Sequence, residues 1–239
     1  FRAMRPSPAA SPSTRRGSVS TTSASASSWR RGPQQSAHGR LYDILYCMGK
    51  VLYLVAGANG SGKSTISTVL LPQKGLVFVN PDDIAREMSP KNPPGVRIEA
   101  GRAALARMND LLSSCRSFAV ESTLSGRAHL SLIARARALG YCIILIYSFV
   151  DSVDACIARI AMRVQAGGHF VPDEDVRRRY LRSKRNFLNV YSPVADEWML
   201  YYNGDSVPVL VAHGGRLDET HVVSPRLMDR FKEDLCPVM

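Results

Sequence analysis

One short segment combines glycines, a lysine and a serine at a spacing that binds phosphate groups. Residues 57–64 fit the pattern G-x-x-x-x-G-K-[ST]. An apolar run, Val51 to Ala56, precedes this segment and a run with helical spacing follows it, which is the context that the pattern requires. The glycines allow backbone N–H groups to surround a phosphate, and the positive end of the helix attracts the anion. The sequence therefore predicts an ATP site that contains Gly57, Ala58, Asn59, Gly60, Ser61, Gly62, Lys63, Ser64 and Thr65.

Two side chains of this loop have expected roles with ATP and Mg²⁺. Lys63 is predicted to reach the β- and γ-phosphates, and the hydroxyl of Ser64 is predicted to bind Mg²⁺. Such a loop does not distinguish kinases from ATPases or GTPases, and no base-recognition sequence of the GTPase type NKxD follows it. The residues that select a phosphate acceptor must therefore lie elsewhere in the chain.

Downstream of Val51, short apolar runs alternate with longer segments of helical spacing, which indicates βα units around a mainly parallel sheet. We predict an α/β fold whose sheet has five to six strands flanked by helices. The predicted strands are 51–56, 76–80, 118–121, 142–150, 198–202 and 207–211. The predicted helices are 63–71, 83–88, 95–114, 126–139, 152–165 and a last one from Pro172. Helix 95–114 is expected to pack through Ile98, Leu105, Met108 and Leu112, and the last helix through Val176, Tyr180, Phe187 and Tyr191.

Acidic residues follow two of the predicted strands, at the sheet edge where doubly wound folds bind ligands. Asp82 is favoured as the base that accepts a proton from an attacking hydroxyl, and Asp83 as a helix cap or first-turn residue. The alternative is that Asp82 only caps the helix. Glu121 can hold the substrate hydroxyl or a Mg²⁺-bound water, or can be a solvated strand end. Thr123 and Arg102 complete the expected substrate contacts.

A basic helix precedes a glycine loop and is predicted to form a lid over about residues 152–190. Arg159 and Arg163 lie one helical turn apart, so both can point at the nucleotide, and the alternative for each is a solvated basic face. Arg163 is the expected catalytic arginine. His169, in the glycine loop, is a second-tier ATP contact. Asp151 resembles a Walker B acid but is interpreted as the cap of the helix that follows it.

Composition separates a tail from the rest of the chain. Residues 1–46 are rich in Ser, Ala, Pro and Arg and are expected to be disordered, while 47–239 form the kinase domain. An upstream-extended reading frame is the favoured origin of this tail, with a disordered arm or a transit segment as alternatives. The net charge of +11 is partly due to the tail, so nucleic acid is not an expected partner. No apolar run suits a membrane, the five cysteines lack metal spacing, and a cytoplasmic protein is expected.

These motifs together resemble the zeta toxin family of P-loop kinases, from about Val51 to beyond Val211. The matching segments are VLYLVAGANGSGKST, FVNPDDIA, EAGRAAL, FAVESTLSG, RVQAGGHFVPDEDVRRRY, SKRNFLNVY and ADEWMLYYN. The resemblance implies an adenylate-kinase-like sheet with a helical lid and transfer of the ATP γ-phosphate to a hydroxyl of a small metabolite. Characterised family members phosphorylate UDP-N-acetylglucosamine and are restrained by an antitoxin, so a separate antitoxin is an expected partner.

By the same resemblance, Lys63 and Ser64 bind phosphate and Mg²⁺, Asp82 is the base, Glu121 contacts the acceptor and Arg163 is a lid arginine. One element departs from the family pattern: His169 stands near the position where the toxins have a second lid arginine. Two alternatives remain, a kinase that acts on 5′-hydroxyls of nucleic acid and a nucleotide-gated binding module without transferase activity.

Overall fold

The computed structural model describes residues 49–71, 76–168, 170–205 and 207–235, all of which belong to one compact unit, residues 43–239. The tail expected over 1–46 and the predicted ATP contact His169 lie outside the described residues. Among the helices that are described, none has both the length and the apolar character needed to cross a bilayer.

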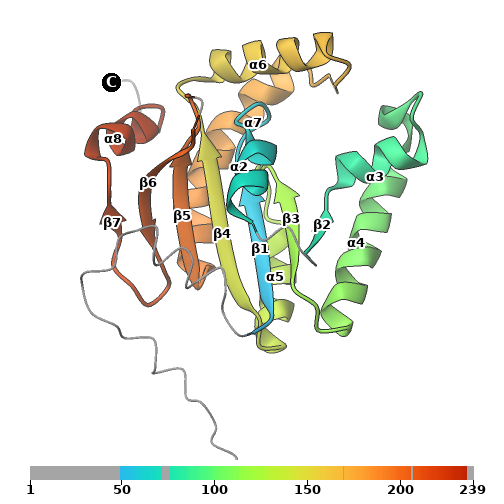
Figure 1. Ribbon diagram of the computed structural model, residues 1–239, viewed down its shortest axis with the longest axis horizontal. Helices are drawn as coiled ribbons and strands as arrows, with labels where there is room; N and C mark the ends of the chain where they lie inside the picture. The colour runs from blue at the N-terminus through green and yellow to red at the C-terminus, as the bar shows by residue number, and fades with distance from the viewer. Residues whose placement is uncertain (1–48, 72–75, 169, 206, 236–239) are drawn as a thin grey trace, which may run out of the picture. The chain divides into compact units, whose positions relative to one another are not determined.

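The centre of the fold is a seven-stranded sheet in the order β2-β3-β1-β4-β5-β6-β7 (Figure 1). The first five strands are parallel, and β6 and β7 continue the sheet in antiparallel orientation. This confirms the predicted α/β class with a mainly parallel sheet. The strands are β1 (Val51–Ala56), β2 (Val77–Val79), β3 (Phe118–Ser122), β4 (Cys142–Phe149), β5 (Glu197–Tyr202), β6 (Val209–Gly214) and β7 (His221–Val222).

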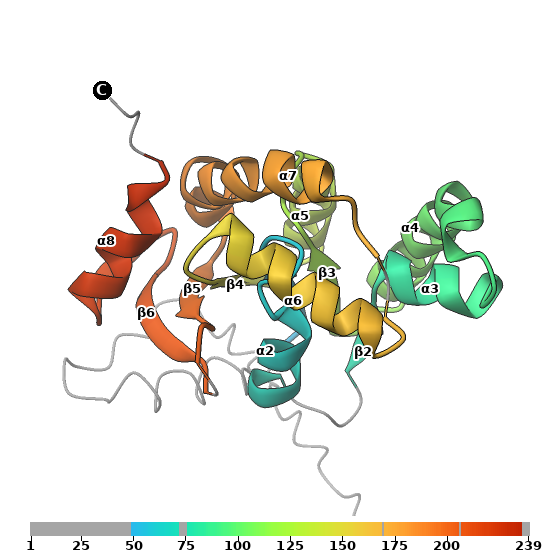
Figure 2. The same ribbon diagram turned by 90° about the horizontal axis from the view of Figure 1, so that it is seen from above.

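Helices cover both faces of this sheet. The views from the side and from above both place α2 on one face and α5 on the other (Figures 1 and 2). The α-helices are α2 (Lys63–Leu70), α3 (Pro81–Met88), α4 (Arg97–Ser113), α5 (His129–Ala138), α6 (Val153–Gln165), α7 (Asp173–Asn186) and α8 (Pro225–Glu233). Short turns of other helix types occupy η1 (Pro93–Val96), η2 (Phe187–Tyr191) and η3 (Ser192–Val194).

The strand β1 is buried on both faces, as expected for a central parallel strand that reads as a continuous apolar run. Its side chains Leu52 and Leu54 belong to the main core, in which Leu112 of α4, Ala136 of α5 and Phe231 of α8 are also buried. In this strand order, the chain runs from β1 to β2 on one side of β1, whereas the connection from the neighbouring strand β3 runs to β4 on the other side. The loop after β1 therefore opens at the topological switch point, where ligands of such sheets bind.

Helix α4 packs through a different face from the one predicted. Met108 and Leu112 are buried as expected, but Ile98 and Leu105 remain 68% and 60% exposed. The buried face is centred on Ala100, Ala104 and Leu111. The prediction rested on the spacing of large apolar side chains, whereas the buried face of this helix also includes two small alanines, Ala100 and Ala104. On α7 and η2, all four predicted core residues are buried: Val176, Tyr180, Phe187 and Tyr191.

The structure decides two predictions about helix starts. Helix α3 begins at Pro81 with Asn80 as its cap, so Asp83 is a first-turn residue, which is one of its two predicted roles, and Asp82 does not cap the helix. The prediction that Asp151 caps the next helix on the lid side is wrong. Helix α6 is capped by Ser152, whose hydroxyl accepts the Ala155 N–H at 3.1 Å. Asp151 instead accepts a hydrogen bond from the Tyr202 hydroxyl at 2.8 Å and forms an ion pair with Arg230 at 3.0 Å. Asp151 therefore ties the end of β4 to β5 and α8.

Candidate active site

The phosphate loop joins β1 to α2 and is held from two neighbouring strands. The Ser148 hydroxyl, on β4, donates to the Ser61 carbonyl at 2.6 Å. The Asn203 amide, directly after β5, donates to the carbonyls of Ser61 and Gly62 at 3.1 and 3.3 Å. Gly62 has a φ of +84°, and a Cβ there would lie 1.8 Å from Asn203 Nδ2. The loop conformation therefore depends on glycine at position 62 and on the strands beside it.

Lys63 folds back over this loop and is almost completely buried. Its Nζ donates to the Ala58 carbonyl at 3.1 Å and lies 3.6 Å from Glu121 Oε1. Glu121 lies near the end of β3, where it is in register with Val55 of β1. The predicted phosphate lysine and the predicted acceptor-side carboxylate are thus direct neighbours.

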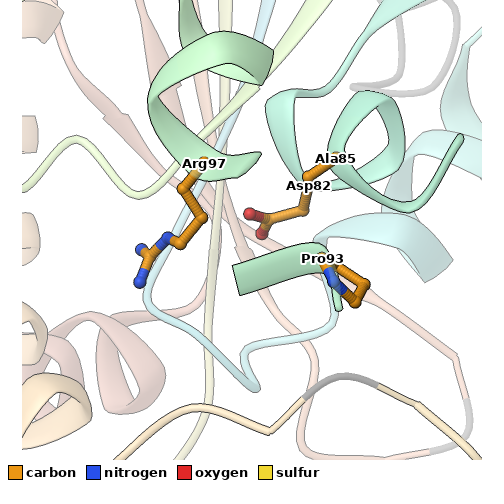
Figure 3. Close-up of a pocket in the computed structure, with 4 residues that line it drawn as sticks. All are labelled: Asp82, Ala85, Pro93 and Arg97. Atoms are coloured by element: carbon orange, nitrogen blue, oxygen red, sulfur yellow. The ribbon is translucent and has the colours of Figure 1, made fainter. Parts of the chain in front are cut away.

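A second carboxylate reaches the same region from α3. The Asn80 side chain caps this helix by accepting the Asp82 N–H at 2.9 Å, and its amide nitrogen donates to Glu121 Oε2 at 3.2 Å. Asp82 lies in the first turn, and its carboxylate points toward the side chain of Arg97 from α4 (Figure 3). Asp83, in the same turn, forms an ion pair with Arg86, and both of these side chains also border the space beside Asp82.

These residues line one cavity of about 1000 Å³. Of the residues predicted for ATP, Mg²⁺ or substrate, those that line it are Asn59, Lys63, Ser64, Asp82, Glu121, Thr123 and Arg163. The lining also includes Phe78, Asn80, Arg97, His129 and Phe170, which have no role predicted from sequence, and Arg179, which the sequence favours only as a second-tier nucleotide contact. The cavity therefore joins the phosphate loop to the ends of β2 and β3, to α3 and α4, and to the lid.

The two lid arginines have different positions. Arg163, near the end of α6, lines the cavity as predicted. Arg159 instead donates to the carbonyls of Asn203 and Gly204 at 2.7 and 2.9 Å, so it fixes the segment that in turn holds the phosphate loop. Arg102 is exposed on α4 and is not among the residues that line the cavity.

Helix α7, part of the predicted lid, contributes charged side chains to the lining of the cavity. Asp175, in its first turn, forms ion pairs with Arg178 at 2.5 Å and Arg179 at 2.9 Å. The hydrogen bond from Arg178 lowers the pKa of Asp175, and the charges of Arg179, Arg178 and, from α4, Arg97 act in the same direction. Asp175 therefore stays ionised, and Arg97 and Asp175 bring opposite charges to the wall opposite the loop.

The pKa of one cavity residue is shifted by burial. Burial lowers the pKa of His129, at the start of α5, below its ordinary value of 6.5. At neutral pH the imidazole is therefore uncharged and can both donate and accept a hydrogen bond. Sequence reasoning gave His129 no role because it follows no recognisable motif.

The side chains around Ser64 fit Mg²⁺ that is bound mainly through phosphate. Within the described residues, no three His, Cys, Asp or Glu side chains gather as a metal cluster. The cavity instead brings the Ser64 hydroxyl, Asp82 and Glu121 beside the phosphate loop. Mg²⁺ usually keeps several waters and takes only one or two protein oxygens together with substrate phosphates, so this donor set suits it.

The loop, the sheet order and the cavity define a nucleotide-binding P-loop domain with a kinase-like fold. A family model described as "AAA domain" matches residues 52–185, more than half of the chain, and the protein belongs to this family. An uncharacterised protein of Haemophilus influenzae is 34% identical over 136 residues, which cover 57% of this chain and 96% of that protein.

Solved structures extend the comparison of the fold. The chain is similar to a chain of the AvrRxo1-ORF1:AvrRxo1-ORF2 complex, with a TM-score of 0.67, 19% identity and coverage of 83% of this chain and 69% of that one. It is also similar to a structure of the PezAT chromosomal toxin–antitoxin system of Streptococcus pneumoniae, with a TM-score of 0.57, 13% identity and coverage of 84% and 89%. The expected resemblance to toxin kinases is confirmed at the level of the fold.

Proposed function

We propose that the protein is an ATP-dependent kinase that transfers the γ-phosphate to a hydroxyl of a small metabolite. The observation that carries this proposal is one cavity that is lined both by the phosphate-loop residues Lys63 and Ser64 and by Asp82 of α3. A site that only hydrolysed or sensed ATP would not need a second carboxylate, such as that of Asp82, beside a space large enough for an acceptor molecule. A complex described as AvrRxo1-ORF1:-ORF2 with ATP shows that a similar fold binds this nucleotide.

The reaction forms a bond between the acceptor oxygen and the γ-phosphorus and breaks the bond between that phosphorus and the β–γ bridging oxygen. Asp82 takes the proton of the attacking hydroxyl, and ADP leaves with the bridging oxygen. Lys63 moves its charge from Glu121 to the β- and γ-phosphates, and Arg163 stabilises the charge on the transferred group from the lid. Mg²⁺, when bound near Ser64, neutralises charge on the phosphates.

The position of one arginine supports an anionic acceptor. The cavity is lined by four arginines, Arg86, Arg97, Arg163 and Arg179, and by four carboxylates, those of Asp82, Asp83, Glu121 and Asp175, so its total charge does not decide the question. Arg97 lies beside Asp82 and is well placed to hold a phosphate or carboxylate of the acceptor, since a guanidinium binds such groups through two hydrogen bonds. A nucleotide sugar of the UDP-N-acetylglucosamine type is therefore the first acceptor to test, with Glu121 and Thr123 as its expected contacts.

A separate antitoxin is proposed as a protein partner, because both similar structures are described as complexes or as a toxin–antitoxin system. Expression of the chain alone and together with its genomic neighbours tests this partner. Growth arrest that a neighbour relieves through a stable complex supports it, and harmless expression with no complex contradicts it.

The kinase proposal is tested by mass spectrometry of a metabolite extract incubated with the protein, ATP and Mg²⁺. We expect at least one metabolite to gain a phosphate, and we expect Lys63→Ala to make no such product. Labelled transfer to single-stranded oligonucleotides but not to metabolites would identify a nucleic-acid kinase instead. Tight ATP binding without any phosphorylated product would identify a nucleotide-gated binding module.

A further inference from the structure

We propose that Asn80 is a positioning residue for phosphoryl transfer, whose single side-chain amide fixes the acceptor-side carboxylate of Asp82 relative to the phosphate-side pair Lys63–Glu121. The proposal rests on the kinase function proposed above. Asn80 has no role in the phosphate-loop pattern or in the assignment of Asp82 as the base.

Both ends of the Asn80 amide are used. Its Oδ1 accepts the Asp82 backbone N–H at 2.9 Å, and its Nδ2 donates to Glu121 Oε2 at 3.2 Å. The orientation of the amide is fixed by its partners, because a backbone N–H can only donate and an ionised carboxylate can only accept. An aspartate at this position would lack the donor, and a serine would lack the second polar atom. Asparagine is therefore the short side chain that makes both contacts.

On the acceptor side, this amide fixes the end of the helix that carries Asp82. Asn80 is the cap of α3, Pro81 fixes the backbone at the first helical position, and Asp82 follows in the same turn. The cap thus anchors the end of the helix that carries the proposed base. Displacement of this end moves the Asp82 carboxylate relative to the phosphate loop.

On the phosphate side, the amide restrains the rotation of Glu121. With Oε2 held by Asn80, the other oxygen faces Lys63 Nζ at 3.6 Å. The Glu121 side chain is 21% exposed, and Asn80 and Lys63 each face one of its two carboxylate oxygens. When Lys63 turns toward phosphate, the bond from Asn80 still keeps Glu121 directed at the loop. The series Lys63, Glu121, Asn80 and α3 therefore links the two halves of the cavity.

Substitutions at position 80 distinguish the role of Asn80 as the cap of α3 from its role as a hydrogen-bond donor to Glu121. Asn80→Ser and Asn80→Asp retain a side-chain oxygen that can cap α3 but remove the N–H donor to Glu121, whereas Asn80→Ala removes both. Asn109→Ser is the matched control, because Asn109 is exposed on α4 and its side-chain oxygen accepts from Arg135. Its contacts involve no residue of the proposed site.

The measurement is steady-state transfer to the acceptor found by mass spectrometry, together with thermal unfolding of each variant. We expect Asn80→Ser to melt near the wild-type temperature while kcat falls about 10- to 100-fold and KM for ATP changes much less, as for other groups that orient a reacting site. Asn80→Ala should show the same loss of kcat and a lower melting temperature, and Asn109→Ser should match the wild type. Wild-type kcat in a folded Asn80→Ser protein would overturn the proposal.

A binding experiment keeps this proposal distinct from the kinase proposal. Calorimetric titration with ADP and Mg²⁺ needs no acceptor, and it can be applied to Asn80→Ser, Glu121→Ala and the double variant. Glu121→Ala removes the oxygen that accepts from Asn80, so we expect Asn80→Ser to weaken ADP binding in the wild-type background and to have no further effect beside Glu121→Ala. Additive effects would overturn the Asn80–Glu121 link even in an active kinase. A wild-type protein that forms no phosphorylated product would refute the kinase function, and this titration would still test the link.

Discussion

Lys63 Nζ lies 3.6 Å from Glu121 Oε1 and also donates to the Ala58 carbonyl, so the phosphate-loop lysine has two protein partners that phosphate must replace. The Glu121 carboxylate both competes for this lysine and repels phosphate. At the same time, it is placed to hold a Mg²⁺-bound water. Glu121 should therefore oppose nucleotide binding when Mg²⁺ is removed and should assist transfer when Mg²⁺ is present.

Glu121→Gln tests these two opposite effects. Loss of one partly buried negative charge beside the loop should tighten binding of Mg²⁺-free ADP by about 3- to 10-fold, and it should slow Mg²⁺-dependent transfer at least about tenfold. Calorimetry with ADP in chelator and a transfer assay with Mg²⁺ measure the two effects. Unchanged affinity for ADP in chelator would show that Lys63 and Glu121 do not interact in solution.

Asp82→Asn should abolish most transfer while ATP still binds. The amide keeps the size of the side chain but cannot accept the hydroxyl proton, and loss of a general base typically costs about 10²- to 10⁴-fold. Asp83→Asn is the comparison, because Asp83 is the neighbouring carboxylate of the same cavity and is already paired with Arg86. Transfer rates and ATP affinities are compared between the two variants. The assignment of Asp82 as the base is wrong if Asp83→Asn is the variant that loses activity.

Gly62→Ala should damage both the loop and the fold. Its φ of +84° is unfavourable for alanine by about 1–2 kcal/mol, and the new Cβ would collide with Asn203 Nδ2. Gly101→Ala makes the same change inside α4, where a Cβ meets no atom within 4 Å, so it should stabilise the protein by about 0.5–1 kcal/mol. Urea unfolding and ATP titration compare the two. Equal stability of the variants would mean that the loop can change conformation freely.

The phosphate loop and the parallel strands could be predicted from sequence because their signals are local. Residues 57–64 carry a fixed spacing, and β1 and β4 are continuous apolar runs that can only be buried strands. The sequence also predicted that Asp82 and Glu121 lie beside the loop, because the carboxyl ends of parallel strands meet at one edge of a sheet.

The residues that hold this site could not be predicted, because their contacts join distant parts of the chain. Asn80 is 41 positions from Glu121, and Asn203 is 142 positions from Ser61. Nothing near Asn203 in the sequence indicates a partner, although a polar residue before glycine at a strand end is a weak signal. Arg159 shows the same limit, since its helical spacing with Arg163 suggested a shared target and its actual partners follow β5.

Cys156 should make stability depend on pH in the alkaline range. Burial raises the pKa of this thiol from 9.0 to about 11, although the charges of Lys63, Arg159 and Lys184 lower it. The unfolded thiol loses its proton near pH 9 while the folded one keeps it, so the stabilisation is complete below pH 9 and is lost as pH rises to 11. The expected loss is about 2–3 kcal/mol. Urea unfolding of wild type and Cys156→Ala between these pH values isolates this contribution as the difference between them, and parallel profiles would contradict it.

Lys184 is a buried lysine that connects helix α7 to the segment after α8. Its Nζ lies 2.5 Å from Asp234 Oδ2, and the rings of Tyr180 and Phe231 lie 5.0 and 4.8 Å from it. Burial lowers the pKa of Lys184, although the hydrogen bond to Asp234 raises it. The ammonium therefore depends on Asp234 to remain charged inside the protein.

Asp234→Ala should leave this ammonium without its counter-ion and lower the free energy of unfolding at neutral pH by about 2 kcal/mol, less than for a fully buried pair because Asp234 is partly exposed. The double variant Lys184→Met/Asp234→Ala should recover most of this loss, since it removes the buried charge and keeps an apolar side chain among the rings. Because the unfolded lysine binds its proton more tightly than the folded one, the stability of the single variant should also rise relative to that of the double variant as pH increases toward 10.5, and this comparison cancels the Cys156 contribution that both proteins share. Urea unfolding of the three proteins measures these differences. A double variant no more stable than Asp234→Ala would show that Asp234 acts through its bond to the Tyr180 hydroxyl and not through Lys184.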